Sequence, residues 1–424
     1  MNKNLKVIEN ARIGEKYYSY THESGLEILL YPMKGYSSCY ALFGTKYGSI
    51  DSTFKKDDDK EFVTVPDGIA HFLEHKLFEN EDGKNAFQHF SQMGASSNAF
   101  TDFDRTCYLF SSSDNINEAL AYLIKNVQAP YFTDENVEKE QGIIGQEIRM
   151  YEDDPNWKVY YNLIDAMYVN NPVKIDIAGT IESISKINKD ILYYCYNTFY
   201  NLSNMVISVA GNFDVDEALD IIIKGLKTEK KVTIHREEFT EPDALNKKEV
   251  TQQLEVSIPL FNIGYKEKFT DNSLEDYVIF TLITDIIAGK GGKLYKELYE
   301  EQLVDADFGA AALYGRGFLS TIFAGESRNP KEVLKRLENT ISQYKKNGIS
   351  QDEFERIRKS LYGRAVMGFN SVSNVSEGLI GNRMVGNHIF DFINCIAELK
   401  LEKVNTLLKN SFKESAISIV EPVK

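Results

Sequence analysis

The stretch Asp67–Phe78 constrains this chain most, because it holds two histidines and a glutamate in the order His-x-x-Glu-His, at His71, Glu74 and His75. Asp67 follows a proline and is a good helix start, since its carboxylate can accept hydrogen bonds from free backbone N–H groups. On a helix, residues three and four positions apart share a face, so the three side chains point the same way. Two imidazoles one turn apart can bind Zn²⁺ at about 2.0–2.1 Å each, and the carboxylate between them can take a proton from an attacking water.

The other faces of this helix carry apolar residues that can be buried, namely Ile69, Phe72, Leu73 and Leu77. The residue order is the inverted form of the His-Glu-x-x-His helix motif of zinc enzymes. A plainer interpretation is a helix with two solvated or hydrogen-bonded histidines. The rest of the chain therefore has to supply a third ligand, a substrate site and a scaffold.

A second helix, expected at Asp134–Tyr151, can supply the third ligand. Its apolar stripe consists of Val137, Ile144, Ile148 and Tyr151, and Glu140 and Glu147 lie at the edge of that stripe. A carboxylate at the edge of a buried face rarely lacks a partner. A cation is one such partner, because Zn²⁺ held by two histidines still needs a third protein ligand. The alternative is that both glutamates pair with Lys or Arg, and the pattern alone does not decide between the two.

Composition narrows the class of protein. The 424 residues are 43% hydrophobic, which suits roughly two to four globular domains. A net charge of −15 argues against a nucleic-acid partner. The sequence contains no apolar run near the ~18 residues of a membrane span, and its start lacks the apolar middle of a signal peptide, so we expect a cytoplasmic protein. We expect the cysteines to be reduced, because Cys39, Cys107, Cys195 and Cys395 form no CxxC pair.

The order of strands and helices predicted in the first half of the chain returns in the second half. In the first half we expect strands at 26–31, 40–47, the two ends of 95–112 and 204–210, and further helices at 87–93, 117–127, 160–167, 189–199 and 215–226. In the second half we expect strands at 249–258, 262–268, 308–314, 319–323 and 416–420, and helices at 274–287, 294–300, 331–346, 351–367 and 372–381. A charged segment, 227–248, is predicted to link the halves.

This repeat of about 200 residues predicts an α+β fold of two homologous domains. We place them at 1–229 and 247–424, each a mainly antiparallel sheet with helices packed on one side. The helix expected at 274–287 takes the place of the motif helix but contains no histidine. The first domain is therefore predicted to bind the metal and to be catalytic, and the second to lack a metal site.

Three stretches together resemble the pitrilysin/insulinase family of zinc peptidases, the inverzincins: His71–His75, Ser97–Thr101 and Glu140–Glu147. The resemblance extends over nearly the whole chain. It is strongest to the bacterial processing-protease-like members, which have one two-domain unit per chain. It implies a zinc metallo-endopeptidase that cuts peptides or precursor and leader segments.

The resemblance also implies a role for each matching residue. His71, His75 and Glu147 become the ligands of one Zn²⁺ per chain, and Glu74 becomes the general base. Glu140 becomes a carboxylate that orients the ligands or assists proton transfer.

Peptide binding is assigned by the same resemblance to Asn98, Ala99 and Phe100, on an edge strand. A free sheet edge offers unpaired backbone N–H and C=O groups, so an extended peptide can add as a further strand. Because that mode binds backbone rather than side chains, it suits peptides of varied sequence.

One part of the family pattern is missing. The family's second-half domain carries an Arg/Tyr pair that stabilises the oxyanion, whereas this chain has Tyr-Glu-Glu-Gln-Leu-Val-Asp-Ala at Tyr299–Ala306. Arg316 and Arg328 follow at the wrong spacing. We therefore predict a heterodimer in which a homologous partner without zinc supplies the pair, and two clam-like halves enclose a chamber for unfolded peptides. A homodimer, a non-catalytic structural subunit and a peptide-binding module are the alternatives.

Overall fold

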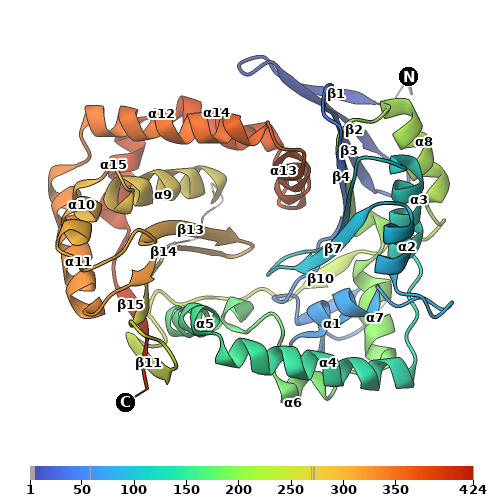
Figure 1. The fold of residues 1–424 in the computed structure, drawn as a ribbon, viewed down its shortest axis with the longest axis horizontal. Helices are drawn as coiled ribbons and strands as arrows, with labels where there is room; N and C mark the ends of the chain where they lie inside the picture. Colours follow the sequence, from blue (N-terminus) through green and yellow to red (C-terminus); the bar gives the residue numbers. More distant parts are fainter. Residues whose placement is uncertain (1–4, 58, 269, 271–272, 424) are drawn as a thin grey trace. The chain divides into compact units, whose positions relative to one another are not determined.

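The computed structural model describes residues 5–57, 59–268, 270 and 273–423 (Figure 1). They form two compact units, which we describe separately. Unit 1 comprises residues up to 148, 176–238 and 366–390, and unit 2 comprises 149–175, 239–365 and the residues from 391 onward. No helix in these described ranges has both the length and the apolar character that crossing a membrane requires.

Unit 1 is built on a seven-stranded sheet in the order β1-β2-β3-β9-β4-β8-β7. The strands are β1 (Lys6–Asn10), β2 (Glu15–Thr21), β3 (Glu27–Pro32), β4 (Cys39–Thr45), β7 (Ser96–Thr101), β8 (Thr106–Ser112) and β9 (Met205–Gly211). Neighbouring strands are antiparallel except β3 and β9. Every residue of β9 is buried, which requires helices on both faces of the sheet.

Helices α3 (Ile116–Val127) and α8 (Val215–Gly225) cover one face of this sheet, and α13 (Val372–Met384) covers the other (Figure 1). Gly44 in β4 makes room for α13, because a Cβ there would lie 2.7 Å from Met384 Cε. The remaining helices of unit 1 are α1 (Ile69–Lys76), α2 (Ala86–Gln92), the first part of α4 (Asp134–Asp153), α6 (Ile181–Ile184) and α7 (Lys189–Phe199).

A small second sheet in unit 1 has the order β10-β5-β6. It consists of β5 (Thr53–Lys56), β6 (Val63–Thr64) and β10 (Ile234–Arg236). Strand β10 lies inside the segment predicted as a linker. It is held because the guanidinium of Arg236 lies 2.7 Å from the buried carboxylate of Asp51 and packs over the ring of Phe199.

Unit 2 contains a five-stranded sheet in the order β11-β15-β12-β14-β13. The strands are β11 (Glu249–Leu254), β12 (Leu260–Lys266), β13 (Gly309–Gly315), β14 (Phe318–Glu326) and β15 (Ser415–Pro422), antiparallel except for β11 with β15. Helix α5 (Pro155–Met167) packs on one face and α9 (Ser273–Ala288) on the other (Figure 1). The other helices are α10 (Lys293–Glu300), α11 (Pro330–Asn347), α12 (Gln351–Gly368), α14 (Ile389–Glu398) and α15 (Leu401–Asn410).

Each sheet thus packs against one helix from the other half of the chain, α13 on unit 1 and α5 on unit 2. In unit 2 the close contact is made at Gly264, where a Cβ would lie 2.5 Å from Met167 Sδ. The two larger sheets and their helices confirm the predicted α+β class. The prediction of helices on one side only is wrong, because α13 and α5 cover the second face of these sheets. The division into 1–229 and 247–424 describes a sequence repeat rather than packing, and it stays a prediction.

The start of α1 differs from the sequence prediction. The N-cap is Gly68, with φ 86°, and no side chain caps the helix, so the capping role predicted for Asp67 is wrong. The backbone carbonyl of Asp67 accepts a hydrogen bond of 2.8 Å from Ser183 Oγ, which fixes the turn in another way. A Cβ at Gly68 would lie 2.4 Å from the carbonyl oxygen of Ala178. Only glycine combines this left-handed conformation with this close approach.

We expect Gly68→Ala to lower the free energy of unfolding by about 2–4 kcal/mol, because it adds a clash with backbone to the cost of a positive φ. Gly14→Ala is the matched control, since Gly14 also has a positive φ (72°) but nothing lies within 4 Å of its added Cβ. The control should lose about 1 kcal/mol. Urea unfolding followed by circular dichroism measures both, and equal losses would contradict the role of the Ala178 contact.

Candidate metal centre

Helix α1 presents its polar and apolar residues to different surroundings. It packs against β7 and β8. The four apolar residues predicted to be buried are buried, with at most 4% exposure: Ile69, Phe72, Leu73 and Leu77. On the remaining face, His71 and His75 bring their rings together with centroids 4.5 Å apart.

Glu147 in α4 reaches both imidazoles, although it is distant from them in sequence. Its Oε1 lies 3.8 Å from His71 Nε2, and its Oε2 lies 3.5 Å from His75 Nε2. One ligand atom from each of the three residues lies within 4.8 Å of the others. Donors bound tetrahedrally to Zn²⁺ at about 2.0–2.1 Å lie roughly 3.3–3.4 Å apart. The three side chains therefore need to move only a little to hold an ion, and their N/N/O donor set suits zinc.

Glu140 lies about two turns before Glu147 on the same face of α4, and it fixes the orientation of His75. Its Oε1 lies 3.0 Å from His75 Nδ1, which leaves Nε2 directed toward Glu147. A carboxylate on the far nitrogen selects the tautomer that a metal ligand requires. Burial by itself would lower the pKa of His75, but the hydrogen bond with Glu140 and the charges of Glu74 and Glu147 raise it.

His71 lies deeper in the protein than His75. Burial, together with the neighbouring His75, lowers the pKa of His71 to about 3. The neutral imidazole is the form that binds a metal. Its Nδ1 has no hydrogen-bond partner among the described residues, so its Nε2 is the nitrogen that faces the site.

Glu74 lies beside the two histidines and is only 9% exposed. Burial raises the pKa of Glu74, and the hydrogen bond that Thr101 Oγ1 donates to its Oε2 at 2.7 Å opposes that increase. Thr101 belongs to the Ser97–Thr101 stretch that resembles the family, but the sequence did not predict it as a site residue. Its hydroxyl, at the end of the strand expected to bind the peptide, is the signal that could have pointed to this role.

Asn98, Ala99 and Phe100 lie on β7, the edge strand of the seven-stranded sheet. Within the described part of the chain, β7 pairs with β8 alone, with Ala99 opposite Tyr108. The other edge of β7 therefore has no strand partner among the described residues. Because Thr101 ends this strand and bonds Glu74, a peptide lying along β7 would run toward the histidines.

The structure agrees in part with the alternative prediction that both glutamates pair with Lys or Arg. Lys76 Nζ lies 3.7 Å from Glu140 Oε2, so Glu140 has a lysine as well as a histidine partner. Glu147 contacts both imidazoles. The structure thus brings His71, His75, Glu147, Glu74 and Glu140 together, and places the three residues proposed for peptide binding on the strand beside them.

Comparisons with known proteins identify the family that this chain resembles. Residues 65–181 match the family model "Insulinase (Peptidase family M16)", and residues 186–361 match "Peptidase M16 inactive domain". The uncharacterized zinc protease YmfH of Bacillus subtilis is 38% identical over 429 residues, covering 99% of each chain. The crystal structure of an M16-like peptidase from Alicyclobacillus acidocaldarius has a TM-score of 0.92 at 32% identity, with 100% of both chains covered. A protease from Helicobacter pylori shares the fold, with a TM-score of 0.83 at 20% identity and 96% and 100% coverage.

We expect the purified protein to bind one zinc ion per chain and His71→Ala to reduce that content to background, because two donors hold zinc poorly. Elemental analysis after dialysis measures the content, and circular dichroism checks the fold. His89→Ala is the matched control, since His89 pairs with Asp82 outside the site. Stoichiometric zinc in His71→Ala would show that the ion binds elsewhere.

Proposed function

Because the chain belongs to peptidase family M16, the insulinase family, we propose that it is a zinc metallo-endopeptidase. Its substrates are extended peptides, including precursor and leader segments of proteins. The observation that carries this proposal is the convergence of His71, His75 and Glu147 with Glu74 beside them. The cytoplasmic location stays a prediction from the sequence.

In this proposal His71 and His75 would hold the zinc ion through Nε2, and Glu147 would hold it through its carboxylate. A zinc ion held there would provide Lewis-acid chemistry for a water molecule and the scissile carbonyl. Glu74 accepts a proton from the attacking water and then donates it to the leaving amine. Glu140 assists by holding His75 in the required tautomer.

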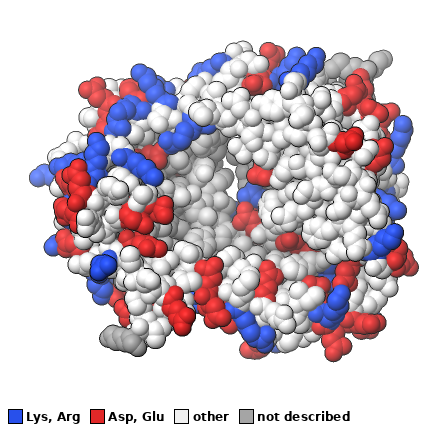
Figure 2. Space-filling model, viewed as in Figure 1, with Lys and Arg blue, Asp and Glu red and all other residues white. Residues whose placement is uncertain are grey.

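Peptide substrates fit the rest of the proposal. Asn98, Ala99 and Phe100 bind the substrate backbone as a further strand on β7. Nucleic acid is disfavoured by the net charge of −15. The face in Figure 2 agrees with this, because acidic and basic side chains are interspersed on it.

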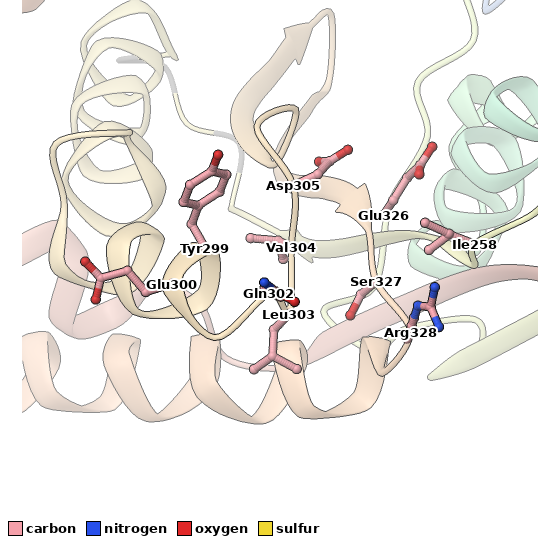
Figure 3. Close-up of a pocket in the computed structure, with 10 residues that line it drawn as sticks. All are labelled: Ile258, Tyr299, Glu300, Gln302, Leu303, Val304, Asp305, Glu326, Ser327 and Arg328. Atoms are coloured by element: carbon pink, nitrogen blue, oxygen red, sulfur yellow. The ribbon is translucent and has the colours of Figure 1, made fainter.

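A homologous partner chain is the second element of the proposal. The segment after α10 lines a pocket of about 500 Å³ in unit 2, shown in Figure 3. Among the described residues of that pocket are the carboxylates of Glu300, Asp305 and Glu326, with Arg328 as the one cation. Since the Arg/Tyr pair expected by resemblance is absent from Tyr299–Ala306, the positive charge for the oxyanion comes from a homologous chain that carries the pair, in a heterodimer that encloses a chamber. The alternative, a homodimer, would lack the pair in both copies.

A non-catalytic subunit is the competing function, and the missing Arg/Tyr pair is the observation that favours it. We expect Glu74→Gln to retain zinc but to cut an unstructured peptide at least about 10²-fold more slowly, because the proton acceptor is lost. Mass spectrometry of the products measures the rate. Exposed Glu81 provides the matched control, Glu81→Gln, which should cut at the parental rate.

This assay also tests the partner, when it is run with the chain alone and with a homologous chain that carries the Arg/Tyr pair. The mixture should cut faster than either chain. Full activity of the chain alone would show that no partner chain is needed. Equal cleavage by the parent and Glu74→Gln, or no cleavage by the zinc-loaded mixture, would contradict the proposed peptidase function.

Thr101→Val should move the acidic limb of the pH–rate profile to higher pH. The base has to be ionised, and the hydroxyl of Thr101 lowers the pKa of Glu74 against the effect of burial. Without it that pKa rises, so activity is lost at a higher pH as the solution is acidified. Thr101→Ser keeps the hydroxyl and should restore the parental limb. An unchanged profile in Thr101→Val would show that the hydrogen bond does not act on the base.

A further inference from the structure

Lys76 directly follows the histidine at position 75 and is completely buried, with 0% exposure. Lysine is almost never fully buried unless its charge is paired. The position lies at the end of α1, on the helix that carries both imidazoles. In the proposed mechanism this side chain takes no part.

The ammonium group of Lys76 has three partners, all within unit 1. It donates hydrogen bonds to Glu79 Oε2 at 2.7 Å and to the backbone oxygen of Asn136 in α4 at 3.0 Å. It also lies 3.7 Å from Glu140 Oε2. Lys76 thus joins the helix that carries the histidines to the helix that carries the carboxylates.

Glu140 is the residue through which this contact reaches the metal centre. The carboxylate is 5% exposed, and its two oxygens face different partners, with Oε1 toward His75 Nδ1 and Oε2 toward Lys76. A carboxylate held at both oxygens cannot rotate freely. A buried carboxylate is also stable as an anion only when opposite charge or hydrogen-bond donors surround it. Lys76 supplies the full positive charge at this point.

We propose that Lys76 is a positioning residue of the metal centre, which holds Glu140 so that His75 presents Nε2 to the ion. The inference rests on the proposed zinc site and adds to it a residue that does not touch the ion. Outer partners of metal ligands commonly change metal affinity by about 10–100-fold. The competing role is purely structural, in which Lys76 only joins α1 to α4 through Asn136 and Glu79.

A double-mutant cycle on the full-length protein separates these roles. The variants are Lys76→Met, Glu140→Gln and the two combined. The dissociation constant for zinc is measured by competition with a chromophoric chelator. Urea unfolding of each zinc-free protein reports its stability separately. Lys139→Met is the matched control, because Lys139 is exposed, lies in α4 next to Glu140 and pairs with Glu79.

We expect Lys76→Met to weaken zinc binding about tenfold and Glu140→Gln by about 10–100-fold. The combined variant should bind zinc as Glu140→Gln does, within about twofold, because Lys76 acts through Glu140. Lys139→Met should bind zinc as the parent does. If Lys76→Met does not fold, Lys76→Gln replaces it, since it removes the charge and keeps a hydrogen-bond donor.

Two results would overturn the inference and leave the proposed function standing. One is parental zinc affinity in both the Met and Gln variants at position 76. The other is the same loss of affinity on changing Lys76 in the Glu140→Gln background as in the parent, which indicates a structural role. A parent protein that binds no zinc would overturn the proposed function, and this inference with it.

Discussion

The interaction on which the site depends joins two imidazoles of one helix, His71 buried and His75 partly exposed, to a carboxylate of another helix. Burial favours neutral His71, while Glu140 and the surrounding negative charge favour a proton on His75. Glu147 faces both imidazoles. A divalent cation among them would satisfy both nitrogens and the carboxylate at once.

The scaffold around the site serves to bring α1 and α4 against each other. Gly68 allows α1 to begin in close contact with the segment that contains Ala178. The apolar residues of α1 anchor it against β7 and β8. Thr101 then connects the edge strand to Glu74. In the function that we propose, the strand that binds the peptide would therefore also position the base.

Local pattern was sufficient to predict the strongest elements. The spacing of His71, Glu74 and His75 predicted one helical face, and the stripe that includes Ile144 predicted α4 with its carboxylates at the edge of the buried side. The predicted strands at 26–31 and 204–210 correspond to β3 and β9, because continuous apolar runs mark strands buried on both faces.

What the sequence did not predict depends on contacts between distant segments. Strands β1 and β2 carry charged and tyrosine residues and become strands through pairing at the sheet edge. The packing of α13 on the first sheet and of α5 on the second joins segments that are distant in sequence, and the close contacts lie at Gly44 and Gly264 of the facing strands. From the sequence alone Lys76 would be expected at the surface. In the structure its ammonium group is buried, where it bonds Glu79 and the backbone of Asn136.

X-ray absorption spectroscopy at the zinc edge tests the central claim most directly. The account predicts a four-coordinate ion with two imidazole nitrogens and oxygen donors at about 2.0–2.2 Å. Sulfur at about 2.3 Å, or an absorption spectrum without imidazole scattering, would contradict it, because the ion would then not lie between α1 and α4.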